Sequence, residues 1–393
     1  MNLISEFNVS YVHGGGLTCK RVLSETLTQF DKLFSLNFNS IDYPMEEKLL
    51  CKSIEIQSLF PYPYIPSGLN IANVIYRFNA FWYKYFCVNF KNYTVFDKYC
   101  NDIADYIIAN SKQKKYLIIP QGPLSINISN LIYKKTRSNY ITWIMDDHLL
   151  EHTRQGWKYK YKYEKKFRLH LENAKKIFVI SPNMQNFYAT RFNVKSDVLF
   201  SGADKFIERQ PKLNLETYKI VYFGSLVNWQ IDSLKILVPI LEKYKIQLHI
   251  YSYNNLLPDF LQHPNIHYIG FLKSNEILTT ISRYHGVVLP FSFDLKYRNM
   301  VEFNIPTKLS EAIASGTIPI IIGPKYSAVI NYLAKENICI QINKISDGKV
   351  IELIKDKENR KKMMIKTRHF FESNISNYIM QNKWLNAFDK YLK

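Results

Sequence analysis

Lys308 and Glu311 are the side chains whose types and spacing best suit ligand binding. They lie three positions apart in a segment that the sequence predicts as a short helix, capped by Thr307 and ended by Gly316. This spacing puts both side chains on one helix face near the N-terminus. A carboxylate there accepts hydrogen bonds from two ribose hydroxyls and an ammonium binds phosphate, so the pair predicts a nucleotide site. A local surface ion pair, worth only about 0.3 to 0.5 kcal/mol, is the alternative interpretation.

A run of glycines, His13-Gly14-Gly15-Gly16, directly follows the first predicted strand. It is not a dinucleotide fingerprint, since Cys19 occupies the position of the last glycine, and the chain has no G-x-S-x-G nucleophile elbow to accompany an esterase oxyanion loop. The run therefore predicts either a close approach of the backbone to a ligand or a tight strand-to-helix turn.

Asp146, Asp147 and His148 follow another predicted strand, over residues 140–145. Ligands bind at the carboxyl ends of parallel strands, so this cluster predicts a contact with a substrate. Capping of the next helix by Asp147 is the alternative. The adjacent aspartates do not form a D-x-D metal motif, and no metal site is predicted.

The elements that must position these residues alternate between apolar β-branched segments and longer helical patterns, which predicts an α/β fold with parallel sheets. The alternation stops at residues 208–218. We therefore expect two doubly wound, Rossmann-like domains that face each other across a cleft, with the first over residues 1–205 and the second over 206–375. The predicted strands cover residues 2–11, 116–120, 140–145, 176–180 and 197–200 in the first domain, and 219–223, 247–251, 266–269, 286–289 and 318–322 in the second.

Composition limits the class of protein. The 393 residues carry 52 Lys and Arg against 33 Asp and Glu, a net charge of +19, with 47% hydrophobic residues, which excludes a disordered or fibrous chain. The five scattered cysteines predict a reducing compartment, and the sequence shows no secretory signal and no membrane-spanning segment, so we expect a cytoplasmic protein. The surplus of positive charge predicts an anionic partner.

The order of several segments resembles the GT-B glycosyltransferases, in particular the retaining family 4 (glycosyl transferases group 1) of bacterial polysaccharide assembly. Residues 306–312 resemble the family's P-x-K-x-x-E segment. The other similar segments are residues 193–206 at the crossing into the second domain, 219–226 at the first strand and turn of the nucleotide domain, 265–271 and 286–291 at two later strands, and 378–392 at the final helix.

This resemblance implies a fold, an activity and a set of site residues. The fold is GT-B, with a last helix over residues 376–393 that returns to the first domain. The activity is transfer of a sugar, with its anomeric configuration kept, from a nucleotide-diphosphate donor to a hydroxyl of a glycan or lipid-linked acceptor, with no metal and no cofactor besides the donor. The donor would be bound by Pro306, Thr307, Lys308, Glu311, Gly224 and Ser225. The acceptor and phosphate side would be shaped by His13, Gly14, Gly15 and Gly16. The acceptor would be oriented by Asp146, Asp147 or His148.

The sequence departs from the family pattern at the donor phosphate. Many members carry an Arg and a Lys after the first glycine turn, where this chain has Ser225 and Trp229, closer to a W-x-D variant. Many also carry a Glu eight positions before the ribose Glu, where this chain has Phe303. Phosphate binding is then expected from backbone N–H groups after Gly224, from Lys308, and from Arg283 or Arg298 unless these arginines are only solvated. 

Residues 157–168 alternate lysine with tyrosine and sort onto two faces of a helical wheel. Basic residues beside aromatic ones suit an anionic membrane surface, which would agree with surface-polysaccharide synthesis at the inner face of the cell membrane. An amphipathic helix that packs Tyr159, Tyr163, Phe167 and Leu171 on the sheet is the alternative.

Three other functions stay open at this point. A nucleotide-sugar 2-epimerase on the same fold would act on the donor alone. A basic glycan-binding scaffold would bind without turnover. A nucleic-acid-binding module would use the positive charge and the 29 Tyr and 25 Phe, but the chain lacks the usual nucleic-acid-binding signatures, so no nucleic acid is expected.

Overall fold

The computed structural model describes residues 1–7, 14–36, 52–59, 94–146, 161–208, 218–253 and 258–393. The chain forms two compact units. Unit 1 comprises Met1–Val179, Tyr188–Asp197 and Trp384–Lys393, and unit 2 comprises Ile180–Phe187 and Val198–Lys383.

Unit 1 is built on a seven-stranded sheet, among the described residues, with strand order β3-β2-β1-β4-β5-β6-β7. The order reverses between β1 and β4, so the carboxyl ends of these strands form the switch point of this sheet. Along this order, every neighbouring pair from β3 across to β6 is parallel. The strands are β1 (Asn2–Ser5), β2 (Lys32–Ser35), β3 (Lys52–Glu55), β4 (Tyr116–Ile119), β5 (Tyr140–Ile144), β6 (Lys176–Val179) and β7 (Asp197–Val198). The helices are α1 (Gly14–Val22), η1 (Leu27–Gln29), α2 (Ile56–Leu59), α4 (Thr94–Asn110), α5 (Pro123–Thr136), α7 (Tyr161–Asn173), α8 (Pro182–Phe192) and α15 (Asn377–Tyr391), of which α8 and α15 have residues in both units.

Helices α4 and α5 bury apolar faces on this sheet. Cys100, Ile103 and Ile107 recur at helical spacing along α4 and are fully buried in one cluster with Ile4 and Ile118 of the strands. The central strands β4 and β5 are short, fully buried and rich in β-branched and aromatic residues, as suits buried parallel strands.

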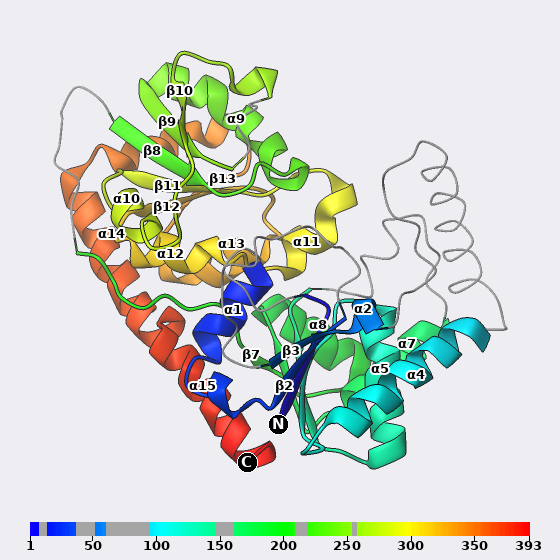
Figure 1. Cartoon of the computed structure of the whole chain (residues 1–393). Helices are drawn as coiled ribbons and strands as arrows, with labels where there is room; N and C mark the ends of the chain where they lie inside the picture. The colour runs from blue at the N-terminus through cyan, green and yellow to red at the C-terminus, as the bar shows by residue number, and fades with distance from the viewer. Residues whose placement is uncertain (8–13, 37–51, 60–93, 147–160, 209–217, 254–257) are drawn as a thin grey trace. The chain divides into compact units, whose positions relative to one another are not determined.

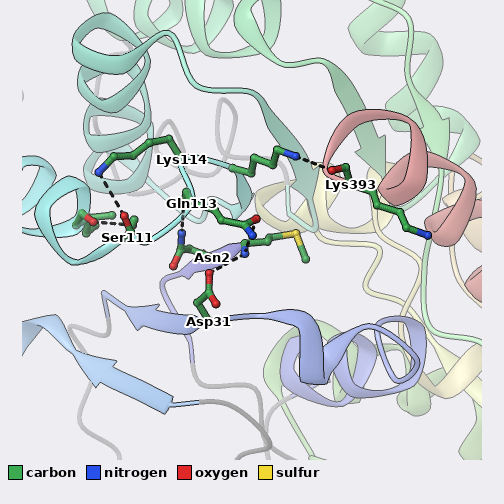
Figure 2. A network of polar contacts seen from close by, with 9 residues as sticks. Asn2, Asp31, Ser111, Gln113, Lys114 and Lys393 are labelled. Atoms are coloured by element: carbon green, nitrogen blue, oxygen red, sulfur yellow. Dashed lines mark hydrogen bonds and ion pairs between the residues drawn. The ribbon is translucent and has the colours of Figure 1, made fainter.

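Polar contacts hold the amino ends of β1 and β4 in place (Figure 2). The Met1 ammonium donates to Asp31 Oδ2 at 2.9 Å, and Asn2 Nδ2 donates to the Gln113 carbonyl at 2.8 Å. Lys115 Nζ donates to the Lys393 carbonyl at 2.7 Å. These bonds join four separate chain segments at the edge opposite the switch point.

Unit 2 repeats the topology with a six-stranded sheet, among the described residues, in the order β10-β9-β8-β11-β12-β13 (Figure 1). All five neighbouring pairs are parallel, and the switch point lies between β8 and β11. The strands are β8 (Tyr218–Phe223), β9 (Ile246–Tyr251), β10 (Ile266–Gly270), β11 (Gly286–Pro290), β12 (Ile318–Ile322) and β13 (Ile340–Ile342). The helices are α9 (Asn228–Tyr244), η3 (Asp259–Leu261), α10 (Ile277–Ile281), η4 (Leu295–Tyr297), α11 (Arg298–Phe303), α12 (Lys308–Ala314), α13 (Ala328–Leu333), η5 (Ala334–Glu336), η6 (Ile345–Ile354), α14 (Lys357–Phe370) and η7 (Phe371–Ile375).

The unit bounds differ from the domain ranges 1–205 and 206–375 expected from the sequence. The chain passes into unit 2 already at Val198, because the segment after it is bonded to α12: Ser310 Oγ donates to the Ser201 carbonyl, and Ile207 N donates to the Ala314 carbonyl at 2.8 Å. The second half of α15 belongs to unit 1, where Trp384 Nε1 donates to Thr26 Oγ1 at 2.8 Å.

Most predicted strands lie where the sequence placed them, and β12 has the predicted bounds. β1 ends at Ser5, although a strand through residue 11 was expected; residues 8–13 lie outside the described residues. Strands β2, β3 and β13 were not predicted. No helix in the described part of the chain is long and apolar enough to span a membrane.

Candidate functional site

The switch point of unit 2 is shaped by a glycine at the end of β8. Gly224 has a φ of +106°, a conformation that side chains rarely adopt, and its N–H donates to the Tyr251 carbonyl at 2.8 Å. A Cβ at this position would lie 2.3 Å from Lys308 Cε and 2.6 Å from Nζ. Glycine therefore lets the end of the Lys308 side chain lie directly against the β8 turn.

Lys308 reaches this turn from the first residue of α12. Its Nζ lies 3.1 Å from Tyr222 Oη, 3.1 Å from Gln230 Oε1, and 4.7 Å from the centre of the Tyr222 ring. Desolvation of the ammonium lowers the pKa of Lys308 to about 7, while the negative charge of Glu311 opposes this shift. The structure thus holds a desolvated cation between neutral acceptors at the switch point.

Glu311 lies one turn further along α12 and is only 5% exposed. A solvated surface ion pair with Lys308 does not fit this burial, since a buried carboxylate is costly unless it is bonded or paired. The two residues predicted as a functional pair are therefore together on one short helix at the carboxyl edge of the sheet.

The ends of α12 agree with the sequence only in part. Gly316 follows the helix with a φ of +70°, as predicted for a C-terminal stop. Thr307 was expected to cap the N-terminus, but it has helical dihedral angles and its side chain makes no capping bond. The Pro306 carbonyl accepts from Leu309 N at 3.0 Å instead, so a turn made by the backbone begins the helix.

Backbone groups complete this site, which we call the unit 2 site (Gly224, Ser225, Tyr222, Gln230, Lys308 and Glu311). The Ser225 carbonyl accepts from Tyr222 Oη at 2.5 Å. Helix α9 begins at Asn228, and its N-cap residue Val227 makes no side-chain capping bond; Ser292 after β11 donates its N–H to the Trp229 carbonyl at 2.8 Å. An uncapped helix N-terminus beside a cation favours an anionic ligand.

The two arginines named for phosphate binding lie on opposite sides of β11 in the chain. Arg283 is exposed and precedes β11, so it lies at the amino edge of a parallel sheet whose carboxyl edge carries Gly224. Arg298, at the start of α11, is bonded through Nε to Glu302 Oε2 at 2.9 Å and lies over the Tyr326 ring. Arg283 is therefore not part of the unit 2 site.

A second polar cluster, which we call the unit 1 cluster, gathers at the switch point of unit 1. Glu6, directly after β1, accepts from the backbone N–H of Ser125 at 3.2 Å and of Gln121 at 3.4 Å, and from Ser125 Oγ. Burial raises the pKa of Glu6, although these hydrogen bonds act in the other direction. This carboxyl group caps the N-terminus of α5, where Gly122 has no side chain to do so.

Asp146 joins the same cluster from the end of β5. Gln121 Nε2 donates to Asp146 Oδ2 at 3.3 Å, and Asp146 is only half-buried. The carboxyl ends of β1, β4 and β5 therefore bring Glu6, Gln121 and Asp146 together, and all three side chains are partly exposed. Asp147 and His148 lie outside the described residues.

The glycine run differs from its prediction. Gly14, Gly15 and Gly16 form the first turn of α1 rather than a loop, and Thr18 Oγ1 bonds to the Gly14 carbonyl at 2.9 Å, which holds this turn. His13 lies outside the described residues.

Sequence reasoning missed Glu6, Tyr222 and Gln230. A carboxylate directly after the first strand was a usable signal for Glu6, but the strand expected over residues 2–11 passed through it. In the sequence, Tyr222 has the pattern of a buried strand residue and Gln230 that of an ordinary helix residue. Only their contacts with Lys308 Nζ in the structure place them in the site.

Two other expectations concern metal and membrane. Among the described residues, no group of three or more His, Cys, Asp or Glu side chains is arranged to hold a metal ion. In α7, Phe167 and Leu171 are buried within unit 1, which agrees with the amphipathic packing alternative for residues 157–168; residues 157–160 are not described.

Comparisons with known proteins concern the fold and the second half of the chain. Residues 233–387 match the family model "Glucosyltransferase 3-like, C-terminal domain". No curated protein sequence matches the chain.

Solved structures match over nearly the full length. Sucrose-phosphate synthase from Thermosynechococcus elongatus has a TM-score of 0.65 at 12% identity, with 99% of this chain and 98% of that chain covered. A glycosyltransferase from Rickettsia africae has 0.64 at 14%, with 99% and 98% covered, and Anabaena HepE in complex with UDP has 0.63 at 9%, with 99% of each chain covered. These likenesses confirm the expected fold class, an α/β fold of the GT-B type with two doubly wound units.

Proposed function

From the GT-B fold and the glucosyltransferase 3-like C-terminal domain that this chain carries, we propose that it is a glycosyltransferase that moves a sugar from a nucleoside-diphosphate donor to a hydroxyl group of a glycan acceptor. The observation that carries the proposal is the unit 2 site, where buried Glu311 and desolvated Lys308 share one short helix at the switch point. A carboxylate and a cation at this spacing suit a ribose and a diphosphate.

The donor would be bound by this site. Glu311 accepts hydrogen bonds from the ribose hydroxyls, and Lys308 with the free N-terminus of α9 binds the diphosphate. As the bond to the sugar breaks, negative charge grows on the leaving diphosphate, and a cation already in place stabilises it. UDP in the HepE structure is the kind of ligand that this site suits.

The acceptor would be oriented by the unit 1 cluster. Asp146 is partly exposed there, whereas Glu6 is engaged in capping α5, and Asp146 accepts a hydrogen bond from the acceptor hydroxyl while Gln121 fixes its orientation. Transfer with retention fits this arrangement if a donor phosphate oxygen takes the acceptor proton, and Asp146 then orients rather than deprotonates. The reaction needs no metal or cofactor in this scheme.

The acceptor class is a lipid-linked glycan of surface-polysaccharide synthesis at the inner face of the cell membrane. The net charge of +19 supports this part of the proposal, because anionic lipid surfaces attract basic proteins.

Calorimetric titration with UDP, GDP, dTDP, ADP and CMP tests the donor site. We expect one of them to bind the wild type and to lose about 1.5 to 3 kcal/mol in Glu311→Ala, the cost of hydrogen bonds to a charged group. Glu352→Ala, an exposed position in η6 of the same unit, serves as the matched control and should bind normally. Binding of no nucleotide, or equal binding by both variants, would contradict the ribose assignment.

A further inference from the structure

The ammonium of Lys308 is held by two side chains that the donor itself need not touch. Tyr222 Oη has one hydrogen, which it donates to the Ser225 carbonyl at 2.5 Å or to Gln230 Oε1 at 3.0 Å. The oxygen lone pair then accepts from Lys308 Nζ at 3.1 Å, and Gln230 Oε1 accepts a second ammonium hydrogen at 3.1 Å. Lysine has three such hydrogens, so one is left for a ligand.

Both holding residues come from well-buried positions. Tyr222 is fully buried at the end of β8, and Gln230, in the first turn of α9, is 5% exposed. Their own contact, 3.0 Å between Tyr222 Oη and Gln230 Oε1, closes a triangle with Lys308 Nζ. Such short, packed side chains fix the ammonium more tightly than the flexible lysine stem could alone.

The groups around this ammonium are uncharged, with one exception. Burial raises the pKa of Tyr222, which keeps the phenol neutral, and Gln230 cannot ionise. Among the described residues, Glu311 on the same helix supplies the negative charge that acts on Lys308, whereas Asp232 of α9 is paired with Lys235. Desolvation therefore dominates, and Lys308 has a pKa of about 7. A diphosphate brought against it would favour the charged form strongly.

We propose that Tyr222 and Gln230 are positioning residues that hold Lys308 toward the diphosphate of the donor, and that because the Lys308 ammonium is desolvated and its hydrogen-bond acceptors are neutral, donor binding draws a proton onto it. This inference rests on the proposed function, since it assigns the anion to the nucleoside diphosphate. It predicts a binding reaction that is linked to pH.

Gln230→Glu is the decisive variant, because it keeps the size of the side chain and adds a charge. Its carboxylate would pair with Lys308 and keep the ammonium charged in the free protein. Nucleoside diphosphate should then bind at least about tenfold more weakly near pH 7.5, because a negative charge now opposes the phosphate. Gln247→Glu makes the same change at the amino end of β9 and should bind as the wild type does.

The pH dependence separates positioning from packing. Between about pH 7.5 and about pH 9 the nucleoside diphosphate is fully ionised, so the wild type should lose about tenfold in affinity per pH unit as Lys308 deprotonates. Calorimetry in buffers of different ionisation enthalpy should show uptake of close to one proton. Gln230→Glu should show a nearly flat profile and almost no uptake, and Tyr222→Phe should bind several-fold more weakly with the wild-type slope.

Two results would overturn the proposal in distinguishable ways. If the wild type binds a nucleoside diphosphate and Gln230→Glu keeps the same pH slope and proton uptake, then Tyr222 and Gln230 only pack, and the donor site stands without them. If the wild type binds none of the nucleotides, the proposed function falls, and this inference with it.

Discussion

The two sheets share one strand order over six strands, but among the described residues only the switch point of unit 2 pairs a carboxylate with an ammonium. In unit 1, the ends of β1, β4 and β5 bring the carboxyl groups of Glu6 and Asp146 to Gln121. In unit 2, the end of β8 meets the ammonium of Lys308. Because the topology is repeated, each sheet has a switch point at its carboxyl edge, and the side chains at that edge decide what it binds.

The two charges are also satisfied differently. Glu6 accepts bonds from Gln121 and Ser125 at the start of α5, so its role is to cap a helix within the protein. Lys308 is held by neutral acceptors and keeps one N–H for a ligand. Glu6 therefore has a structural role at the start of α5, whereas the remaining N–H of Lys308 favours a ligand that accepts a hydrogen bond from it.

Lys308→Met gives the largest expected effect, because it removes the cation from the unit 2 site. The rate of sugar transfer should fall by about 10² to 10³, as expected when a group that stabilises the leaving diphosphate is lost. Release of nucleoside diphosphate from the donor measures this rate, and Lys243→Met, an exposed residue near the end of α9, is the control. An active Lys308→Met enzyme would remove the contrast between the two sites.

Lys308→Met should also change how the stability of the ligand-free protein depends on pH. Folding lowers the pKa of Lys308 to about 7, so between about pH 7 and about pH 10 the unfolded chain binds more protons than the folded one. The wild type therefore gains stability from this group as the pH rises through that window. Lys308→Met should lack this gain, which thermal unfolding at two pH values measures.

Asp146→Asn should lower turnover by about 10², the cost of a misplaced acceptor, while the dissociation constant for nucleoside diphosphate stays within about twofold. The reason is that Asp146 belongs to the unit 1 cluster and Lys308 to the unit 2 site. Simple alkyl glycosides serve as acceptor probes, and Asp105→Asn, an exposed carboxylate paired with Lys135, is the matched control. A parallel loss of nucleotide affinity would show that the two sites do not have separate roles.

Much of the fold follows from local patterns in the sequence. The β-branched runs of β8, β11 and β12 predict buried parallel strands because such strands are apolar on both faces. β2 and β3 could not be predicted because each strand has only four residues, and charged residues (Lys32, Lys52 and Glu55) occupy their ends. β13 is three residues long and gives too short a pattern.

The site could be predicted only where the spacing itself carried the chemistry. Lys308 and Glu311 are close in sequence, so helix geometry alone brings them together. Gln230 lies 78 positions from Lys308, and Gln121 lies 25 from Asp146, and such pairs depend on the order of strands in the sheet. The side chain of Thr307 makes no cap because the Pro306 carbonyl already accepts the bond that begins α12.

Arg283→Ala should have the smallest effect, and it marks the limit of the unit 2 site. Arg283 was expected to bind phosphate in place of the family's missing Arg and Lys, but its exposed side chain precedes β11, while Gly224 follows β8, and these strands are parallel. At the opposite edge of the sheet its charge is screened by solvent. The affinity for nucleoside diphosphate should therefore stay within about twofold at moderate salt, as measured by calorimetry. A loss of affinity of tenfold or more would mean that the diphosphate is bound at the amino edge of the sheet and not at the carboxyl edge.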